Sequence, residues 1–150
     1  MKKTVLASLL MGMTGLLVGA PASADITSQL FAPSQGEFMS AAQAFAFTAT
    51  QQSNGQVSIS FDIAQGYHLY RHQFSFTANN VELSPVTLPP GVLHDDPYQG
   101  KQQLYSGLLK FVLDVNNVEP GATVIVKYQG CAGKALCYPP QRQVVTLNAG

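Results

Sequence analysis

QVSISFDI, residues 56–63, decides the fold class of this chain, because polar and apolar side chains alternate strictly along it. Successive side chains of a β-strand point to opposite faces, so the alternation predicts a strand with one buried, apolar face. The apolar positions are Val57, Ile59, Phe61 and Ile63. The stretch therefore indicates a sheet with one face in a hydrophobic core.

Further strands are predicted on both sides of this stretch. The other runs with strand character cover residues 44–49, 67–71, 73–76, 81–88, 108–115, 122–128 and 142–147. Phe45 and Phe47 alternate with alanines and are expected in the core, whereas Pro85 marks the run 81–88 as an edge strand. Residues 40–44 give at most one helical turn. Seven or eight short strands with frequent turn residues predict an all-β fold, an immunoglobulin-like antiparallel β-sandwich.

The N-terminus has the regions of a secretory signal peptide. Two lysines precede an apolar run over residues 5–19, and a small-x-small sequence ends at Ala24. The run is short and interrupted for a transmembrane anchor, which is the alternative. Cleavage after Ala24 would remove residues 1–24 and leave one domain over residues 25–150. We expect this mature chain in the periplasm, as a monomer without membrane insertion.

The charge of the expected mature chain excludes some classes of partner. The leader holds two of the eight basic residues and no acidic residue, so six basic residues face eight acidic ones, a net charge of −2. Such a balance provides no electrostatic footprint for nucleic acid or for an anionic membrane.

The chain has two cysteines, Cys131 and Cys137, within the segment GCAGKALCYPP, residues 130–140. In an oxidising compartment they can form a disulfide. Closing so short a loop stabilises a fold by only about 2 kcal/mol in the chain-entropy model. The pair is therefore a candidate for redox chemistry, with a structural bridge as the alternative. Gly130 and Gly133 are expected to permit unusual backbone angles beside it.

The cysteine segment and several upstream segments resemble the N-terminal periplasmic domain of DsbD, a bacterial membrane thiol:disulfide interchange protein. The similar segments, in the order of that family, are residues 44–47, 66–71, 88–92, 94–101 and 131–140. The resemblance implies an immunoglobulin-like sandwich with one redox-active cysteine pair under a cap loop. It implies no cofactor beyond that pair. It also implies a thioredoxin-like electron donor, the C-terminal domain of DsbD, and acceptors such as the isomerase DsbC or the cytochrome c maturation thioredoxin.

The roles of the two cysteines follow from the resemblance. The second cysteine forms the mixed disulfide in the family, which makes Cys137 the interchange nucleophile and Cys131 the resolving thiol. Asp96 matches an acidic residue near the sulfurs. A neighbouring carboxylate raises a thiol pKa, so we expect a reduced pair that is weakly nucleophilic until a partner opens the cap.

The remaining site residues match the family in part. Tyr98 stands where the family cap commonly has Phe, and Pro97 stands where an acidic residue is common, so acid-base assistance from that position is lost. His68 replaces a common Tyr, whereas Tyr70 matches. Tyr138 follows the second cysteine directly and is expected near the sulfurs.

Two function classes remain open at this point. The first is a protein-disulfide reductase component, which relays electrons by thiol exchange, either alone or as one domain of a larger enzyme. The second is a non-catalytic, exported immunoglobulin-like binding module with a structural disulfide. A metal site is not expected, because His68 and His72 would lie about 13 Å apart on an extended strand, and no His-rich or Met-rich cluster is present.

Overall fold

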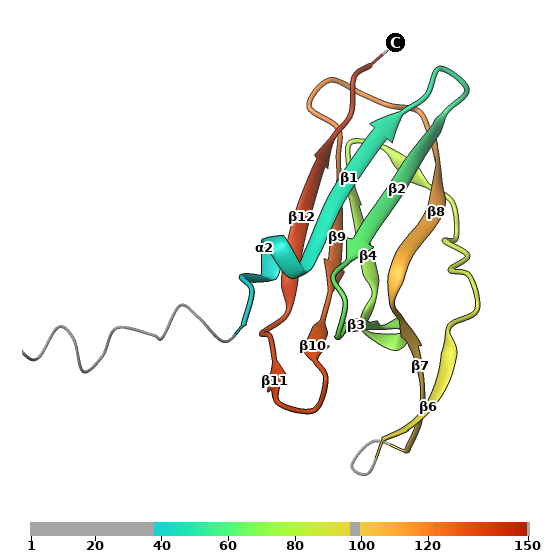
Figure 1. Ribbon diagram of the computed structural model, residues 1–150. Helices are drawn as coiled ribbons and strands as arrows, with labels where there is room; N and C mark the ends of the chain where they lie inside the picture. The colour runs from blue at the N-terminus through green and yellow to red at the C-terminus, as the bar shows by residue number, and fades with distance from the viewer. Residues whose placement is uncertain (1–37, 97–99, 150) are drawn as a thin grey trace, which may run out of the picture. The chain divides into compact units, whose positions relative to one another are not determined.

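The computed structural model describes residues 38–96 and 100–149, which form β-strands over most of their length (Figure 1). The expected signal peptide, residues 1–24, lies outside these residues. So do two of the expected cap positions, Pro97 and Tyr98.

The alternating stretch forms the centre of the first sheet, whose strand order is β1-β2-β8-β5. Its strands are β1 (Phe45–Gln51), β2 (Gln56–Ile63), β8 (Gly107–Asn116) and β5 (Glu82–Leu83). The four apolar residues of β2 are at most 3% exposed, which confirms the predicted buried face. The edge position predicted for residues 81–88 is also confirmed, although only two of these residues pair with a neighbouring strand. Pro85 has no N–H and prevents a longer ladder there.

One helical turn, α2 (Ala41–Ala44), leads into β1 as expected. The Ser40 hydroxyl accepts a hydrogen bond from the Gln43 amide, and the Gln43 side chain accepts one from the Ser40 amide. This reciprocal pair is a capping box, which satisfies donors that a short helix leaves unpaired.

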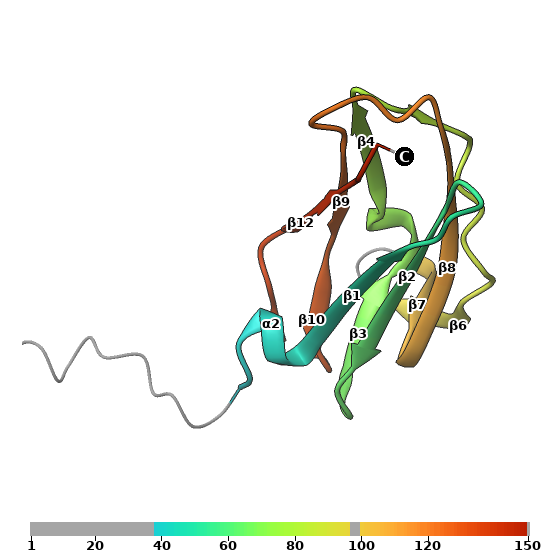
Figure 2. The same cartoon turned by 90° about the horizontal axis from the view of Figure 1, so that it is seen from above.

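A second sheet packs against the first (Figure 2). Its strand order is β12-β9-β4, and the strands are β12 (Gln141–Thr146), β9 (Thr123–Tyr128) and β4 (Ser75–Asn79). Phe61 of β2 meets Tyr128 of β9 edge to face, with ring centroids 4.7 Å apart. The two sheets enclose the core between them and therefore form an antiparallel β-sandwich, as predicted.

The third sheet lies at the lower end of the sandwich in Figure 1, and it carries both cysteines. Its strand order is β11-β10-β3-β7-β6. The strands are β11 (Leu136–Cys137), β10 (Gly130–Ala132), β3 (Tyr67–Tyr70), β7 (Gly100–Tyr105) and β6 (Val92–Asp96). The hairpin of β6 and β7 was not predicted from the sequence.

The described residues form twelve strands rather than seven or eight, because β6, β7, β10 and β11 of the third sheet lie outside the predicted runs. The chain passes from β9 into β10 at Gln129, and from β3 into β4 through the short 3-10 helix η1 (Arg71–Gln73). At Gly107, with φ of +66°, the chain turns from β7 into β8. The strands at this end of the sandwich thereby form a separate third sheet, which carries the cysteines.

Gly130 is required by close packing at the sheet change, not by an unusual backbone angle. A Cβ atom built on it would lie 2.5 Å from the carbonyl oxygen of His68 and 2.5 Å from Cζ of Phe45. The sequence-based expectation of an unusual angle holds for Gly133, at φ of +51°, but not for Gly130, which is absent from the residues with positive φ.

We expect Gly130→Ala to lower the free energy of unfolding by about 2–3 kcal/mol, because backbone must shift to admit the methyl group. Urea unfolding measures this loss. Gly133→Ala is the matched control, since its Cβ would meet no heavy atom closer than 4.0 Å. It should cost only about 1 kcal/mol, from the left-handed backbone. Equal losses in the two variants would contradict the packing explanation.

Candidate functional site

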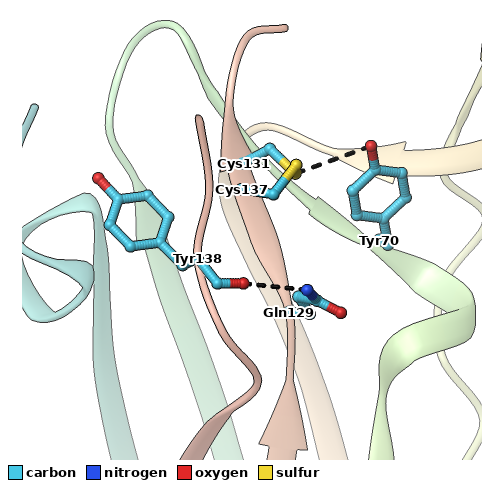
Figure 3. Close-up of a disulfide and its surroundings, with 5 residues drawn as sticks. All are labelled: Tyr70, Gln129, Cys131, Cys137 and Tyr138. Carbon is cyan, nitrogen blue, oxygen red and sulfur yellow. Dashed lines mark hydrogen bonds between the residues drawn. A yellow bond between two sulfur atoms is a disulfide. The ribbon is translucent and has the colours of Figure 1, made fainter. Parts of the chain in front are cut away.

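Cys131 and Cys137 face each other across the hairpin of β10 and β11 and form a disulfide (Figure 3). Their Cα atoms are 4.0 Å apart. The Tyr138 amide donates to the Gly130 carbonyl next to the pair, which places the cysteines at the non-hydrogen-bonded position of the ladder. Side chains approach most closely at such positions. The local backbone therefore brings the two sulfurs together.

The two cysteines differ in accessibility. Cys131 is 1% exposed, whereas Cys137 is exposed and lies in the edge strand β11. In a thiol exchange, the attacking sulfur must reach the sulfur that it attacks. Another protein can therefore approach Cys137 from solvent, whereas Cys131 is reached mainly through Cys137.

Tyr70 connects the buried sulfur to a carboxylate. Its hydroxyl oxygen lies 3.8 Å from Sγ of Cys131 (Figure 3). Burial raises the pKa of Tyr70, and the charge of Asp96 together with a hydrogen bond to its carboxylate raises it further. The phenol therefore stays protonated at neutral pH and donates to Asp96. In the reduced state its oxygen can accept a hydrogen bond from a thiol.

His68 also lies on the sulfur-bearing face of the third sheet. It is the register partner of Cys131 across β3 and β10, and directly opposed residues in an antiparallel pair share one face. Its ring centroid is 5.1 Å from that of Tyr70. The structure thus brings together Cys131, Cys137, His68, Tyr70 and Asp96, whose roles in exchange stay predictions.

Tyr138 lies on the opposite face of this sheet, against the core (Figure 3). Its hydroxyl donates to the Met39 carbonyl, and its ring meets Phe45 edge to face at 5.5 Å. The structure therefore does not bring this ring to the sulfurs, where the sequence predicted it. Instead, Tyr138 fixes the hairpin to the core.

Gln129 supports the hairpin and was not singled out from the sequence. Its side-chain amide donates to the Tyr138 carbonyl at 3.0 Å, and its own carbonyl accepts from the Tyr70 amide at 3.1 Å. These bonds join the exit of the hairpin to β3. A lone glutamine at a strand end carries no pattern that would predict this bracing.

No group of three or more His, Cys, Asp or Glu side chains that could hold a metal ion occurs within residues 38–96 and 100–149. His72 lies in η1, beyond the end of β3, rather than on an extended strand with His68. None of the helices in these residues is long and apolar enough to cross a membrane.

Fold and site together define a class of protein. It is an immunoglobulin-like β-sandwich with a disulfide on a terminal hairpin, in which one cysteine is exposed and the other is buried next to a phenol and a carboxylate. The sequence model of the family "Thiol:disulfide interchange protein DsbD, N-terminal" matches residues 35–149. The chain belongs to this family.

Full-length relatives support the same membership. The thiol:disulfide interchange protein DsbD of Colwellia psychrerythraea is 40% identical over 124 residues, which are 83% of this chain and 20% of that protein. DsbD of Escherichia coli K12 is 39% identical over 127 residues, 84% of this chain and 22% of that protein. The chain thus spans about a fifth of the length of these relatives.

Two solved structures share the fold. The reduced N-terminal domain of Neisseria meningitidis DsbD superposes with a TM-score of 0.65 at 23% identity, covering 74% of this chain and 90% of that one. A complex between the DsbD N-terminal and the PilB N-terminal domains of the same species gives a TM-score of 0.65 at 22% identity, with 76% and 90% covered. The expected immunoglobulin-like sandwich is confirmed.

Proposed function

We propose that this chain is a thiol-disulfide exchange module that passes two electrons to oxidised partner proteins through Cys131 and Cys137. The observation that carries the proposal is the asymmetry of the pair: an exposed Cys137 is bonded to a buried Cys131 on a short surface hairpin. A bridge that only braces a fold gains nothing from such access. Membership of the DsbD N-terminal family supports the same function.

The exchange follows from the accessibility of the two sulfurs. In the reduced module the Cys137 thiolate attacks one sulfur of the partner's disulfide, and the other sulfur of the partner leaves as a thiolate. Cys131 then loses its proton and attacks Sγ of Cys137. This second attack restores the internal disulfide and releases the second partner thiolate. The partner gains two electrons and, from the module and solvent, two protons.

We propose a periplasmic location, with a thioredoxin-like domain of the DsbD type as the electron donor. The acceptors would be oxidised periplasmic proteins, such as a DsbC-type isomerase or a cytochrome c maturation thioredoxin. A complex between the DsbD N-terminal and PilB N-terminal domains has been solved for Neisseria meningitidis, which supports docking of another protein's domain on this fold.

The reduction potential of the cysteine pair tests this proposal. We expect a value between about −270 and about −120 mV, the range of proteins that exchange disulfides. It is measured by equilibration in glutathione or dithiothreitol buffers, followed by thiol trapping and mass spectrometry. A potential below about −300 mV, in a pair that reduced thioredoxin does not attack, would favour the alternative function, a binding module with a structural bridge.

A further inference from the structure

One nitrogen on the sulfur-bearing face has no partner. Nε2 of His68 is buried and makes no hydrogen bond. Buried polar side-chain atoms are nearly always paired, so an unpaired one calls for an explanation. No other side-chain nitrogen or oxygen of a buried or half-buried residue is left in this state within residues 38–96 and 100–149.

The position of His68 indicates which group can donate a hydrogen bond to Nε2. Cys131 stands directly opposite on β10, where the Cβ atoms of such a pair lie about 5 Å apart. In the disulfide neither sulfur carries a hydrogen, so the cysteine pair offers Nε2 no donor. Reduction gives each sulfur an S–H group. The cysteine pair can therefore supply a donor to an acceptor nitrogen on this face only when it is reduced.

The other titratable groups around His68 lie on its own strand, on β6 and in the turn between β10 and β11. Tyr70 lies on its own strand, and His94 and Asp96 lie on β6. Lys134, in the turn between β10 and β11, lines the same pocket of about 430 Å³ as His68 and His94. Burial lowers the pKa of His68, the neighbouring His94 lowers it further, and Asp96 acts in the opposite direction. The ring is consequently neutral at neutral pH and able to accept a proton.

We propose that His68 is the catalytic base for Cys131: in the reduced module its Nε2 takes the proton of the Cys131 thiol and creates the thiolate that resolves the mixed disulfide. This inference rests on the exchange function proposed above. It assigns to Cys131 a base on the neighbouring strand β3. The thiol of Cys137, on the edge strand, loses its proton to solvent instead.

The step is balanced within the residues named. The Cys131 S–H bond breaks, and its proton moves to Nε2 to give an imidazolium. The sulfur electron pair forms the bond to Sγ of Cys137, and the bond between Cys137 and the partner sulfur breaks. The partner leaves as a thiolate and takes the proton from the imidazolium, directly or through solvent. His68 is then neutral again.

Stopped-flow reaction of the reduced protein with the aromatic disulfide 5,5′-dithiobis(2-nitrobenzoate) separates the two steps. Attack by Cys137 depends on reagent concentration, whereas attack by Cys131 on the mixed disulfide does not. We expect His68→Gln to slow the second phase about 10-fold near neutral pH. A free thiol is only a few per cent ionised there, whereas a thiol paired with a base can be ionised to a large extent. The first phase should change less than about twofold.

The pH profile distinguishes a base from a merely structural residue. In the unsubstituted protein the second phase should rise with pH through the titration of an imidazole, because only the neutral ring accepts the proton. In His68→Gln that rise should be replaced by a single one in the thiol range. His72→Gln is the matched control, since it removes an exposed imidazole from η1, and it should alter neither phase.

An unchanged second phase and pH profile in His68→Gln would overturn the inference while leaving the exchange function intact. If His68→Gln does not fold, the profile of the unsubstituted protein decides: a second phase that follows only a thiol titration overturns the inference, and a rise in the imidazole range supports it. If the unsubstituted protein shows no second phase, the proposed function itself fails, and the inference fails with it.

Discussion

Cys131→Ser is expected to trap an oxidised thioredoxin-like partner as a stable mixed disulfide, whereas Cys137→Ser is expected to trap none. The reason is that Cys137 is exposed and Cys131 is 1% exposed. A single exposed thiol can attack a partner but cannot then be released by a second thiol. Electrophoresis without reductant, with mass spectrometry of the product, measures the trapped fraction after reduced variant and oxidised partner are mixed.

Both variants should remain folded, which makes their comparison meaningful. The bridge closes a loop of about seven residues, so its loss costs only about 2 kcal/mol in the chain-entropy model, and most residues of the core lie on other strands. Cooperative urea unfolding of both variants is the control. Equal trapping by the two variants would contradict the proposed order of attack. Loss of cooperative unfolding in either one would favour a bracing role for the disulfide.

The sandwich could be predicted from the sequence because its evidence is local. Side-chain burial along β2 and β8 alternates with a period of two, although Leu108 and Val112 on the other face of β8 are apolar and exposed. Sheet changes at Gln129 and η1 could not be predicted in this way. They depend on which distant strand offers a partner, and the residues before and after each change have the same strand character.

The faces of the site were partly predictable from the same period. His68 and Tyr70 are two positions apart on β3, so they share a face. Cys137 and Tyr138 are neighbours, so Tyr138 must point away from a face that holds both sulfurs, as the structure shows. The approach of Asp96 could not be derived from spacing, because it depends on pairing of β6, β7, β3 and β10 across the sheet. Only the family resemblance indicated it.

Phe45→Ala is expected to produce the largest loss of stability among the changes considered, about 3–5 kcal/mol. The ring is fully buried and meets the rings of Tyr67, Tyr128 and Tyr138 edge to face at 5.5–6.2 Å. Urea unfolding measures the loss. Phe47→Ala is the control, since Phe47 is only partly buried at the edge of the same core, and it should cost less.

The same variant tests whether the core holds the cysteine hairpin in place. Phe45 packs beneath Gly130 and Tyr138, the two residues whose backbones close the ladder next to the cysteines. Removing the ring should loosen the hairpin and expose Cys131. In a Cys137→Ser background, alkylation of Cys131 by iodoacetamide should therefore become faster with Phe45→Ala but not with Phe47→Ala. If Phe45→Ala leaves the alkylation rate unchanged, the hairpin is held by its own hydrogen bonds and by Gln129. The burial of the resolving thiol would then be a property of the third sheet alone.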